Sequence, residues 1–445
     1  MKKPAFLLLL VIGNIQHIES QEVLFPERIM MTIPGNPATT RAVSWLTAYA
    51  DTISLGEIVI SDAAPDLEEK KVTIPGTCKP WEDGNLKNMG HKVIFENLKP
   101  ETKYSYRVGN PNSWSEWFQF ETSSEKAEPF SFLYFGDIQN KIKSYGSRIL
   151  RQAYSHFPEA DFMLFVGDLV RVSSEEYWKE YFYASGWILG MLPSLPSPGN
   201  HEYDEQENGP RTFSKHWNQI FTMPSNEPSA KYRNRNYYID YQGVRFISLD
   251  SPAFEGNSED DEMVFGWLEH SLTENPNRWA IVFTHYPIYS CKQGVDNKRY
   301  RERAKIILEK YGVDLVLQGH DHTYCRGQYL SSSGIDVPNH PMYIVSVAGQ
   351  KMYGLNASLL SDRVASNTQL YQYINIKGNE LSYKSFTATG ELYDEFMMKK
   401  RKNGNDIVVP RKLRKIEQRT QIPAGEETEY SVEEMQKYYL KFPKN

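Results

Sequence analysis

The first hundred residues after the N-terminal segment alternate between short apolar runs and polar turns. Strand-like runs occur at 43–46 and 57–60, and residues 104–108 alternate as a half-buried strand does. Before this last run, residues 98–102 contain a proline and have the composition of a turn. Short strands with turns at this spacing predict a small all-β sandwich over residues 22–122.

After a polar link at 123–128, the pattern changes to apolar runs that alternate with helical stretches. Ser173 and Glu176 have the spacing of a capping box for a helix that runs toward Trp187. Strands are predicted at 132–135, 162–166, 244–249, 279–283, 313–317, 371–376 and 381–387, and further helices at 145–156 and 301–311. The alternation predicts an α/β domain with a partly parallel sheet over residues 129–398.

The N-terminus has the order of a secretory signal peptide. Lys2 and Lys3 precede an apolar run at 5–13, and Ser20 is a small residue suited to cleavage. The run is shorter than the roughly 20 residues that a membrane-spanning helix needs. We therefore expect residues 1–20 to be a signal peptide and the mature chain, without a transmembrane segment, to be exported and either secreted or periplasmic. An uncleaved anchor is the alternative.

The charge of the chain is uneven. The formal net charge is −6, which gives no reason to expect nucleic acid binding. Residues 399–419 nevertheless hold nine basic and two acidic side chains. We interpret residues 399–445 as a basic C-terminal extension, with a short amphipathic helix at 431–442. Such a run is usually a solvated tail, and contact with an anionic surface or partner is the alternative.

Six side chains with metal-binding chemistry follow predicted strands. The intervals are similar: 31 residues from Asp137 to Asp168, 32 from Asp168 to Asn200 and 35 from His285 to His320. Each interval fits one strand–helix–strand unit, so the loops that follow the strands meet at one edge of the sheet. The six candidates are Asp137, Asp168, Asn200, His285, His320 and His322.

The residue types in this set suit a pair of metal ions. Carboxylate, imidazole and amide oxygen ligands favour iron, zinc or manganese. Two ions about 3.5–4 Å apart need a carboxylate that bridges them. A single Gly-Asp is usually a turn, and a single histidine is usually a packing or surface residue. The common order and spacing at strand ends is what predicts a two-metal phosphoesterase.

The order GD…GD…GNHE…H…GHDH resembles that of the calcineurin-like metallophosphoesterases. The resemblance implies a β-sandwich of two mixed sheets flanked by helices. Residues 91–109 resemble the end of the fibronectin-III-like domain found in the purple acid phosphatase branch, and the strands at 371–387 resemble its terminal hairpin. The resemblance covers residues 22–398 and implies an α/β metallophosphoesterase domain preceded by a small all-β domain.

The resemblance also implies roles for single residues. Asp137 and His322 would bind the first metal, whereas Asn200, His285 and His320 would bind the second. Asp168 would bridge the two ions. His201 would face the substrate, where it binds a phosphate oxygen or protonates the leaving group; an imidazole exchanges protons near neutral pH.

The implied activity is that of an acid phosphatase-like hydrolase. A metal-bound hydroxide would attack the phosphate monoester of a small phosphorylated substrate. Two other functions stay open. One is phosphodiesterase or nucleotidase action on the same metal pair. The other is a binding or adhesion protein that keeps a vestigial metal site.

One position departs from the branch. Arg171 stands where coloured members carry a tyrosine whose phenolate binds ferric iron. Without the phenolate we expect no charge-transfer colour, and a preference for ferric iron is in doubt. An arginine beside two cations is unfavourable unless an anion lies between them. Arg171 therefore either contacts bound phosphate or points outward, and we favour the outward direction.

The chain contains three cysteines: Cys78, Cys291 and Cys325. Three cysteines do not make a disulfide framework. Cys291 follows His285 by six residues, and Cys325 follows His322 by three. If both histidines bind one metal pair, the two cysteines lie near each other. A disulfide and two buried free thiols are both open.

Overall fold

The computed structural model describes most of the chain between residues 25 and 423. Its described residues are 25–206, 209–254, 256, 258–328, 340–356, 361–401, 404–410, 413, 415–421 and 423. The predicted signal peptide at 1–20 and the predicted helix at 431–442 lie outside the described residues. Within the described part, no helix has the length and apolar character needed to cross a membrane.

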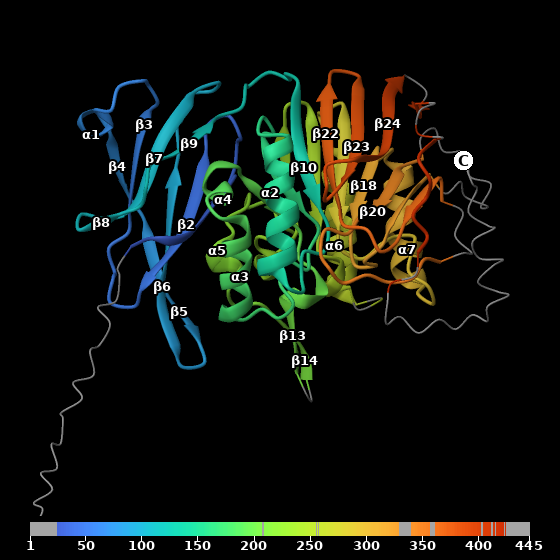
Figure 1. Ribbon diagram of the computed structural model, residues 1–445, viewed down its shortest axis with the longest axis horizontal. Helices are drawn as coiled ribbons and strands as arrows, with labels where there is room; N and C mark the ends of the chain where they lie inside the picture. The colour runs from blue at the N-terminus through green and yellow to red at the C-terminus, as the bar shows by residue number, and fades with distance from the viewer. Residues whose placement is uncertain are drawn as a thin grey trace, which may run out of the picture.

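Two antiparallel sheets pack face to face in the N-terminal domain (Figure 1). Their inner faces enclose a core that includes Trp45, Phe95, Tyr106 and Phe118. One sheet has the order β1 (Glu27–Thr32), β2 (Arg41–Ala48), β6 (Leu86–Phe95) and β5 (Thr77–Asp83). The other has the order β4 (Val72–Pro75), β3 (Leu55–Ile60), β7 (Lys103–Asn110) and β8 (Ser113–Trp114). Strand β9 (Phe118–Glu121) also pairs with β7, and the short helix α1 (Leu67–Lys70) lies between β3 and β4 in the sequence. The predicted all-β sandwich is confirmed.

A buried histidine makes this domain sensitive to acid. His91 lies 2.6 Å from Thr47 Oγ1 and 2.7 Å from Ser54 Oγ, and it stacks on Trp45. Burial lowers the pKa of His91 to about 4 from its usual 6.5. The unfolded chain therefore takes up the proton first as the pH falls. The stability contributed by neutral His91 is complete above pH 6.5 and is lost progressively toward pH 4.

We expect a His91→Gln variant to show a flatter decline in melting temperature between pH 6.5 and pH 4 than the parent protein. Scanning calorimetry across this range measures the two slopes. Other titrating groups, such as His216, whose pKa is also lowered by burial, contribute equally to both proteins. Parallel slopes would contradict this role for His91.

The second domain contains two seven-stranded mixed sheets that face each other across a shared core. The first has the order β12 (Ser194–Pro196), β11 (Phe162–Phe165), β10 (Phe130–Phe135), β22 (Leu370–Lys377), β23 (Glu380–Thr387), β24 (Leu392–Arg401) and β25 (Gly404–Val408). The second has β15 (Tyr237–Tyr241), β16 (Val244–Leu249), β17 (Trp279–Thr284), β18 (Leu315–Gln318), β20 (Met342–Val345), β19 (Tyr324–Gly327) and β21 (Arg363–Ala365). Apolar side chains of both sheets, among them Phe132, Phe246 and Leu317, interlock between them.

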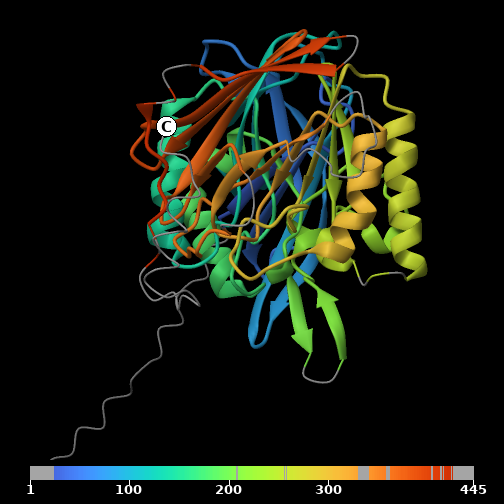
Figure 2. The same cartoon turned by 90° about the vertical axis from the view of Figure 1, so that its right-hand side faces the viewer.

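Helices cover the outer faces of this sandwich (Figures 1 and 2). α6 (Glu259–Thr273) and α7 (Lys298–Lys310) pack on the second sheet, where Leu268 and Ala304 join Val282 in one core. On the first sheet lie a π-helical turn (Ile142–Gly146) and α2 (Ser147–His156). Between this sheet and the N-terminal domain lie α3 (Glu175–Ser185), α4 (Ile188–Met191) and α5 (Trp217–Ile220), with α4 against β1 and α5 against β2. The predicted sandwich of two mixed sheets flanked by helices is confirmed.

Two details differ from the sequence-based expectation. Helix α3 has Ser174 as its N-cap, so the capping box predicted at Ser173 and Glu176 is wrong. The Ser173 hydroxyl instead contacts Ser214 and accepts a hydrogen bond from Trp178 Nε1 at 3.1 Å. Strand β24 crosses residue 398, and β25 pairs with it, so the first part of the basic extension belongs to the sheet.

Candidate metal centre

The candidate ligands converge because parallel strands of both sheets end at the same edge. β10, β11 and β12 run parallel in the first sheet, and β16, β17, β18 and β20 run parallel in the second. Asp137 and Asp168 follow β10 and β11, and His285 and His320 follow β17 and β18. The site therefore lies where the carboxyl ends of both sheets meet, as is usual for α/β domains.

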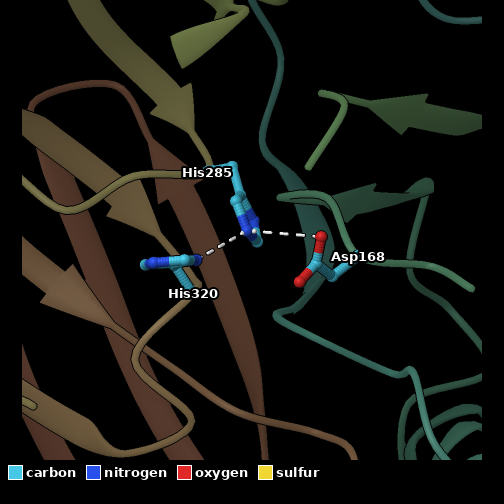
Figure 3. A group of neighbouring side chains, drawn as sticks. All are labelled: Asp168, His285 and His320. Atoms are coloured by element: carbon cyan, nitrogen blue, oxygen red, sulfur yellow. Dashed lines mark hydrogen bonds and ion pairs between the residues drawn. The ribbon is translucent and has the colours of Figure 1, made fainter. Parts of the chain in front are cut away.

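One group of ligands comes mainly from the second sheet, and we call it the second group (Figure 3). It comprises Asp168, His285 and His320, whose ligand atoms lie within 4.8 Å of one another. His285 Nε2 lies 3.3 Å from Asp168 Oδ1 and 3.2 Å from His320 Nδ1. Asn200 Oδ1 is 3.0 Å from the same nitrogen. Three further candidate ligand atoms therefore lie within 3.3 Å of His285 Nε2.

The first group comprises Asp137, Asp168 and His322. His322 Nε2 lies 3.5 Å from Asp137 Oδ1, and this carboxylate oxygen is buried without a hydrogen-bond partner among the described residues. A buried, unpaired carboxylate oxygen is costly unless a cation neutralises it. The residues of both groups thus fit a pair of metal ions.

Asp168 belongs to both groups and presents a different oxygen to each. Its Oδ1 faces His285 at 3.3 Å, whereas its Oδ2 lies on the side of His322, where Gln139 Nε2 donates to it at 2.7 Å. The side chain is 1% exposed. This is the arrangement expected of a carboxylate that bridges two ions.

Backbone carbonyls fix the orientation of two of the ligand imidazoles. Nδ1–H of His285 donates to the Val166 carbonyl at 2.8 Å, and that of His322 donates to the Lys351 carbonyl at 2.9 Å. In each ring Nε2 is left to face the ligand group. Carbonyl partners of this kind set the tautomer of metal-binding histidines.

The buried charges of the site are mutually dependent. Burial alone would lower the pKa of His285, but the carboxylates of Asp168 and Asp137 raise it well above its usual range. Burial and the charge on His285 together lower the pKa of His320. Burial also lowers the pKa of His322. One proton on His285 therefore balances part of the acidic charge, and a bound cation would compete with that proton.

The backbone at the site is strained. Positive φ angles occur at Asp137 (45°), Asp168 (50°), His320 (71°) and His322 (50°), in the left-handed region that side chains with a Cβ rarely adopt. Glycine neighbours make this packing possible, because a Cβ at Gly199 would collide with the Asp168 carboxylate. Strain concentrated on four of the six candidate ligands is typical of a functional site.

His201 lies beside the groups rather than within them. Its backbone N–H donates to Asp168 Oδ1 at 2.9 Å, and its ring Nδ1–H donates to the Arg171 carbonyl at 2.6 Å. Nε2 is left 3.9 Å from Asp168 Oδ2, and the side chain is 31% exposed. The imidazole thus borders solvent on one side and the bridging carboxylate on the other. Arg171 itself has an exposed side chain, and its carbonyl is the part that contacts the site.

Sequence reasoning missed the role of Glu202. This buried carboxylate accepts backbone hydrogen bonds from Asp168, Leu169, Val170 and Gly199, at 2.6–3.4 Å. It therefore joins the loop that carries Asp168 to the loop that carries Asn200. Its place in Gly-Asn-His-Glu was the signal that could have pointed to this role.

Asp321 makes a similar connection on the second sheet. Its carboxylate accepts hydrogen bonds from Ser290 Oγ at 3.0 Å and from the backbone N–H of Lys292 at 3.2 Å. Next to it Cys291 and Cys325 form a disulfide with a Cα–Cα distance of 6.3 Å, within the usual range. Two links, the hydrogen bonds of Asp321 and the disulfide, therefore join the loops after His285 and His320. Cys291 and Cys325 thus form a disulfide and are not free thiols.

Comparison with known proteins agrees with this geometry. Residues 130–324 match the calcineurin-like phosphoesterase family, and residues 26–122 match the purple acid phosphatase N-terminal domain. Purple acid phosphatase 21 of Arabidopsis thaliana is 26% identical over 338 residues, 74% of this chain and 73% of that protein. Acid phosphatase type 7 of Homo sapiens is 26% identical over 68% of this chain and 70% of its own length.

The fold has a counterpart among solved structures. A purple acid phosphatase from yellow lupin (Lupinus luteus) seeds superposes with a TM-score of 0.68 at 16% identity, covering 85% of this chain and 75% of that one. The likeness in fold thus extends over most of the present chain. The chain therefore carries a calcineurin-like phosphoesterase domain preceded by a purple acid phosphatase N-terminal domain.

Proposed function

We propose that this chain is a phosphatase that hydrolyses phosphate monoesters of small substrates with two metal ions. Metal-dependent phosphoester hydrolysis is the chemistry of its family. The two-ion form of that chemistry is supported above all by Asp168, which turns one oxygen toward each ligand group. Iron, zinc and manganese all suit the mixed carboxylate, imidazole and amide donors.

The six candidate ligands would be divided between the two ions. Asp137 and His322 would hold one ion, and Asn200, His285 and His320 the other, with Asp168 shared. When bound, the ions supply Lewis acidity and lower the pKa of a coordinated water. The chain's own contribution is to fix these donors in place before the substrate arrives, which removes the cost of reorganising them during reaction.

His201 completes the proposed site. The Arg171 carbonyl anchors its Nδ1–H, so Nε2 would be free to face a phosphate group of the substrate. From there Nε2–H, when protonated, can donate to a phosphate oxygen or to the leaving-group oxygen. The exposed side of the imidazole allows the leaving group to depart toward solvent.

The test is an assay of the purified protein with a chromogenic phosphomonoester and the matching diester. We expect monoester hydrolysis that a chelator abolishes and that manganese, zinc or iron restores. We also expect no visible charge-transfer band in the metal-loaded protein. Faster diester hydrolysis would favour a phosphodiesterase instead. Tight metal retention without hydrolysis of any ester would favour a binding protein.

We include export of the chain, directed by residues 1–20, in this proposal. The Cys291–Cys325 disulfide supports it, because disulfides persist in oxidising compartments and are rare in the cytosol. The domain limits of 22–122 and 129–398 and a separate extension at 399–445 also stay predictions, although β24 runs across residue 398.

A further inference from the structure

Gln139 lies inside the first group, although no charge or imidazole marked it in the sequence. It follows Asp137 by two residues, and its side chain is 1% exposed. Its Nε2 lies 2.7 Å from Asp168 Oδ2 and 3.0 Å from His322 Nε2. Its Oε1 is buried and has no hydrogen-bond partner among the described residues.

The contacts of this amide are with two acceptors that belong to the metal centre. His322 already donates Nδ1–H to the Lys351 carbonyl, so its Nε2 offers a lone pair. Asp168 Oδ2 offers another. The NH₂ of Gln139 therefore holds the position to which these lone pairs would attract a cation.

An ion in the first group is incompatible with an NH₂ pointed at it. The amide of glutamine has nearly the same shape when its oxygen and nitrogen are exchanged by a half-turn. Such a half-turn would bring Oε1 to face Asp168 and His322 and would place the NH₂ where Oε1 now has no partner among the described residues. The backbone supports this position, since the Gln139 N–H donates to the Asp168 carbonyl at 3.0 Å.

We propose that Gln139 Oε1 is a ligand of the metal ion in the first group, in a centre where Arg171 stands in place of the phenolate ligand. This inference rests on the proposed two-metal function. Each group would then contain an amide oxygen, from Asn200 in one and Gln139 in the other. The first group would consist of Asp137, Asp168, His322 and Gln139.

The replacement changes the charge available to the first ion. A neutral amide oxygen takes the place of an anionic phenolate, so Asp137 and Asp168 are the two anionic side chains among the proposed ligands. Two divalent ions carry four positive charges, and the two carboxylates balance two of them. A trivalent ion would add a further charge without an anionic ligand to balance it. The first group therefore selects a divalent ion.

The experiment compares four forms of the full chain: the parent, Gln139→Leu, Gln139→Glu and Gln372→Leu. Leucine keeps the side-chain volume but has no oxygen, and glutamate restores an oxygen donor. Gln372 is the matched control, because it is a fully buried glutamine whose Nε2 donates to the hydroxyls of Ser346 and Ser385. Its Oε1, like that of Gln139, has no hydrogen-bond partner among the described residues. Each protein is stripped of metal, titrated with Mn²⁺ by calorimetry, and checked by elemental analysis after dialysis.

We expect two Mn²⁺ sites in the parent and in Gln372→Leu. In Gln139→Leu we expect one site to weaken by at least about 10-fold, the lower end of what the loss of a supporting group at a metal site costs. Gln139→Glu should retain both sites. If Gln139→Leu binds both ions with parental affinity, the inference is wrong and the two-metal function stands. If the parent binds no metal, both are wrong.

A second measurement separates a ligand from a residue that only holds Asp168 in place. Iron(III) binding is followed by absorbance and elemental analysis in the parent and in Gln139→Glu. We expect the added carboxylate to increase the retention of iron(III) in the first group relative to the parent. Equal retention would show that the side chain at position 139 does not contact the ion.

Discussion

Replacing Asp168 with asparagine is expected to remove both metal ions and nearly all activity. Asparagine keeps the shape of the side chain, which matters because Gly199 packs directly against the carboxylate and leaves no room for a longer one. The change removes the negative charge that both ligand groups share. We expect kcat to fall by about 10³-fold, comparable to the largest effects of single electrostatic groups in active sites. Elemental analysis should find less than one ion per chain.

The control for this variant lies at the other end of the same strand. Asp161 immediately precedes β11, whereas Asp168 follows it, so Asp161→Asn changes the same kind of side chain away from the ligand groups. This control should retain both ions and full turnover. An Asp168→Asn protein that keeps two tightly bound ions would contradict the bridging role. Retention of one ion would show that the carboxylate serves one group alone.

The fold was largely predictable because its strands are fully buried or cleanly alternating. Residues 132–135 and 162–165 are continuous apolar runs, as expected for strands covered on both faces. Strands β24 and β25 were missed for a physical reason. β24 alternates buried and exposed positions at Phe396, Met397 and Met398, but the lysines and arginine that follow give the segment the composition of a solvated tail.

The site was predictable as far as it depends on side-chain chemistry. The six candidate ligands lie together because each follows or borders a strand end, which the sequence pattern indicates. The left-handed backbone at Asp137 and Asp168 was not predictable, because aspartate adopts this conformation in a minority of cases and the sequence does not mark which ones. Gln139 and Glu202 were missed for a related reason. A neutral amide and a carboxylate that binds backbone N–H groups have no characteristic spacing in a sequence.

The Cys291–Cys325 pair shows what the sequence can predict and what needs the structure. Sequence reasoning could place the two cysteines near each other through the neighbouring ligands His285 and His322. It could not decide between a disulfide and free thiols, because that depends on Cα separation and on side-chain direction. The structure supplies both.

Replacing His201 with alanine is expected to lower turnover while both metal ions stay bound, unlike Asp168→Asn, which is expected to lose both the ions and the activity. His201 contacts the centre through its backbone N–H, which donates to Asp168 Oδ1 and is kept in the variant. The lost imidazole Nε2 is the group positioned to donate a proton or a hydrogen bond to the substrate. General acid catalysis typically contributes 10²–10⁴-fold, so we expect kcat to fall by about 10²-fold or more.

The dependence on the leaving group separates the two roles open to His201. A general acid matters most when the leaving alcohol is poor, so the loss should be larger for an alkyl phosphate than for a nitrophenyl phosphate, whose phenolate departs without a proton. A residue that only binds a phosphate oxygen would give equal losses for both substrates. His156→Ala serves as the control, because this histidine lies on α2 and contacts Tyr371 at 2.7 Å rather than a ligand. Parental rates in His201→Ala with both substrates would remove His201 from the mechanism and leave the metal ligands as the source of catalysis.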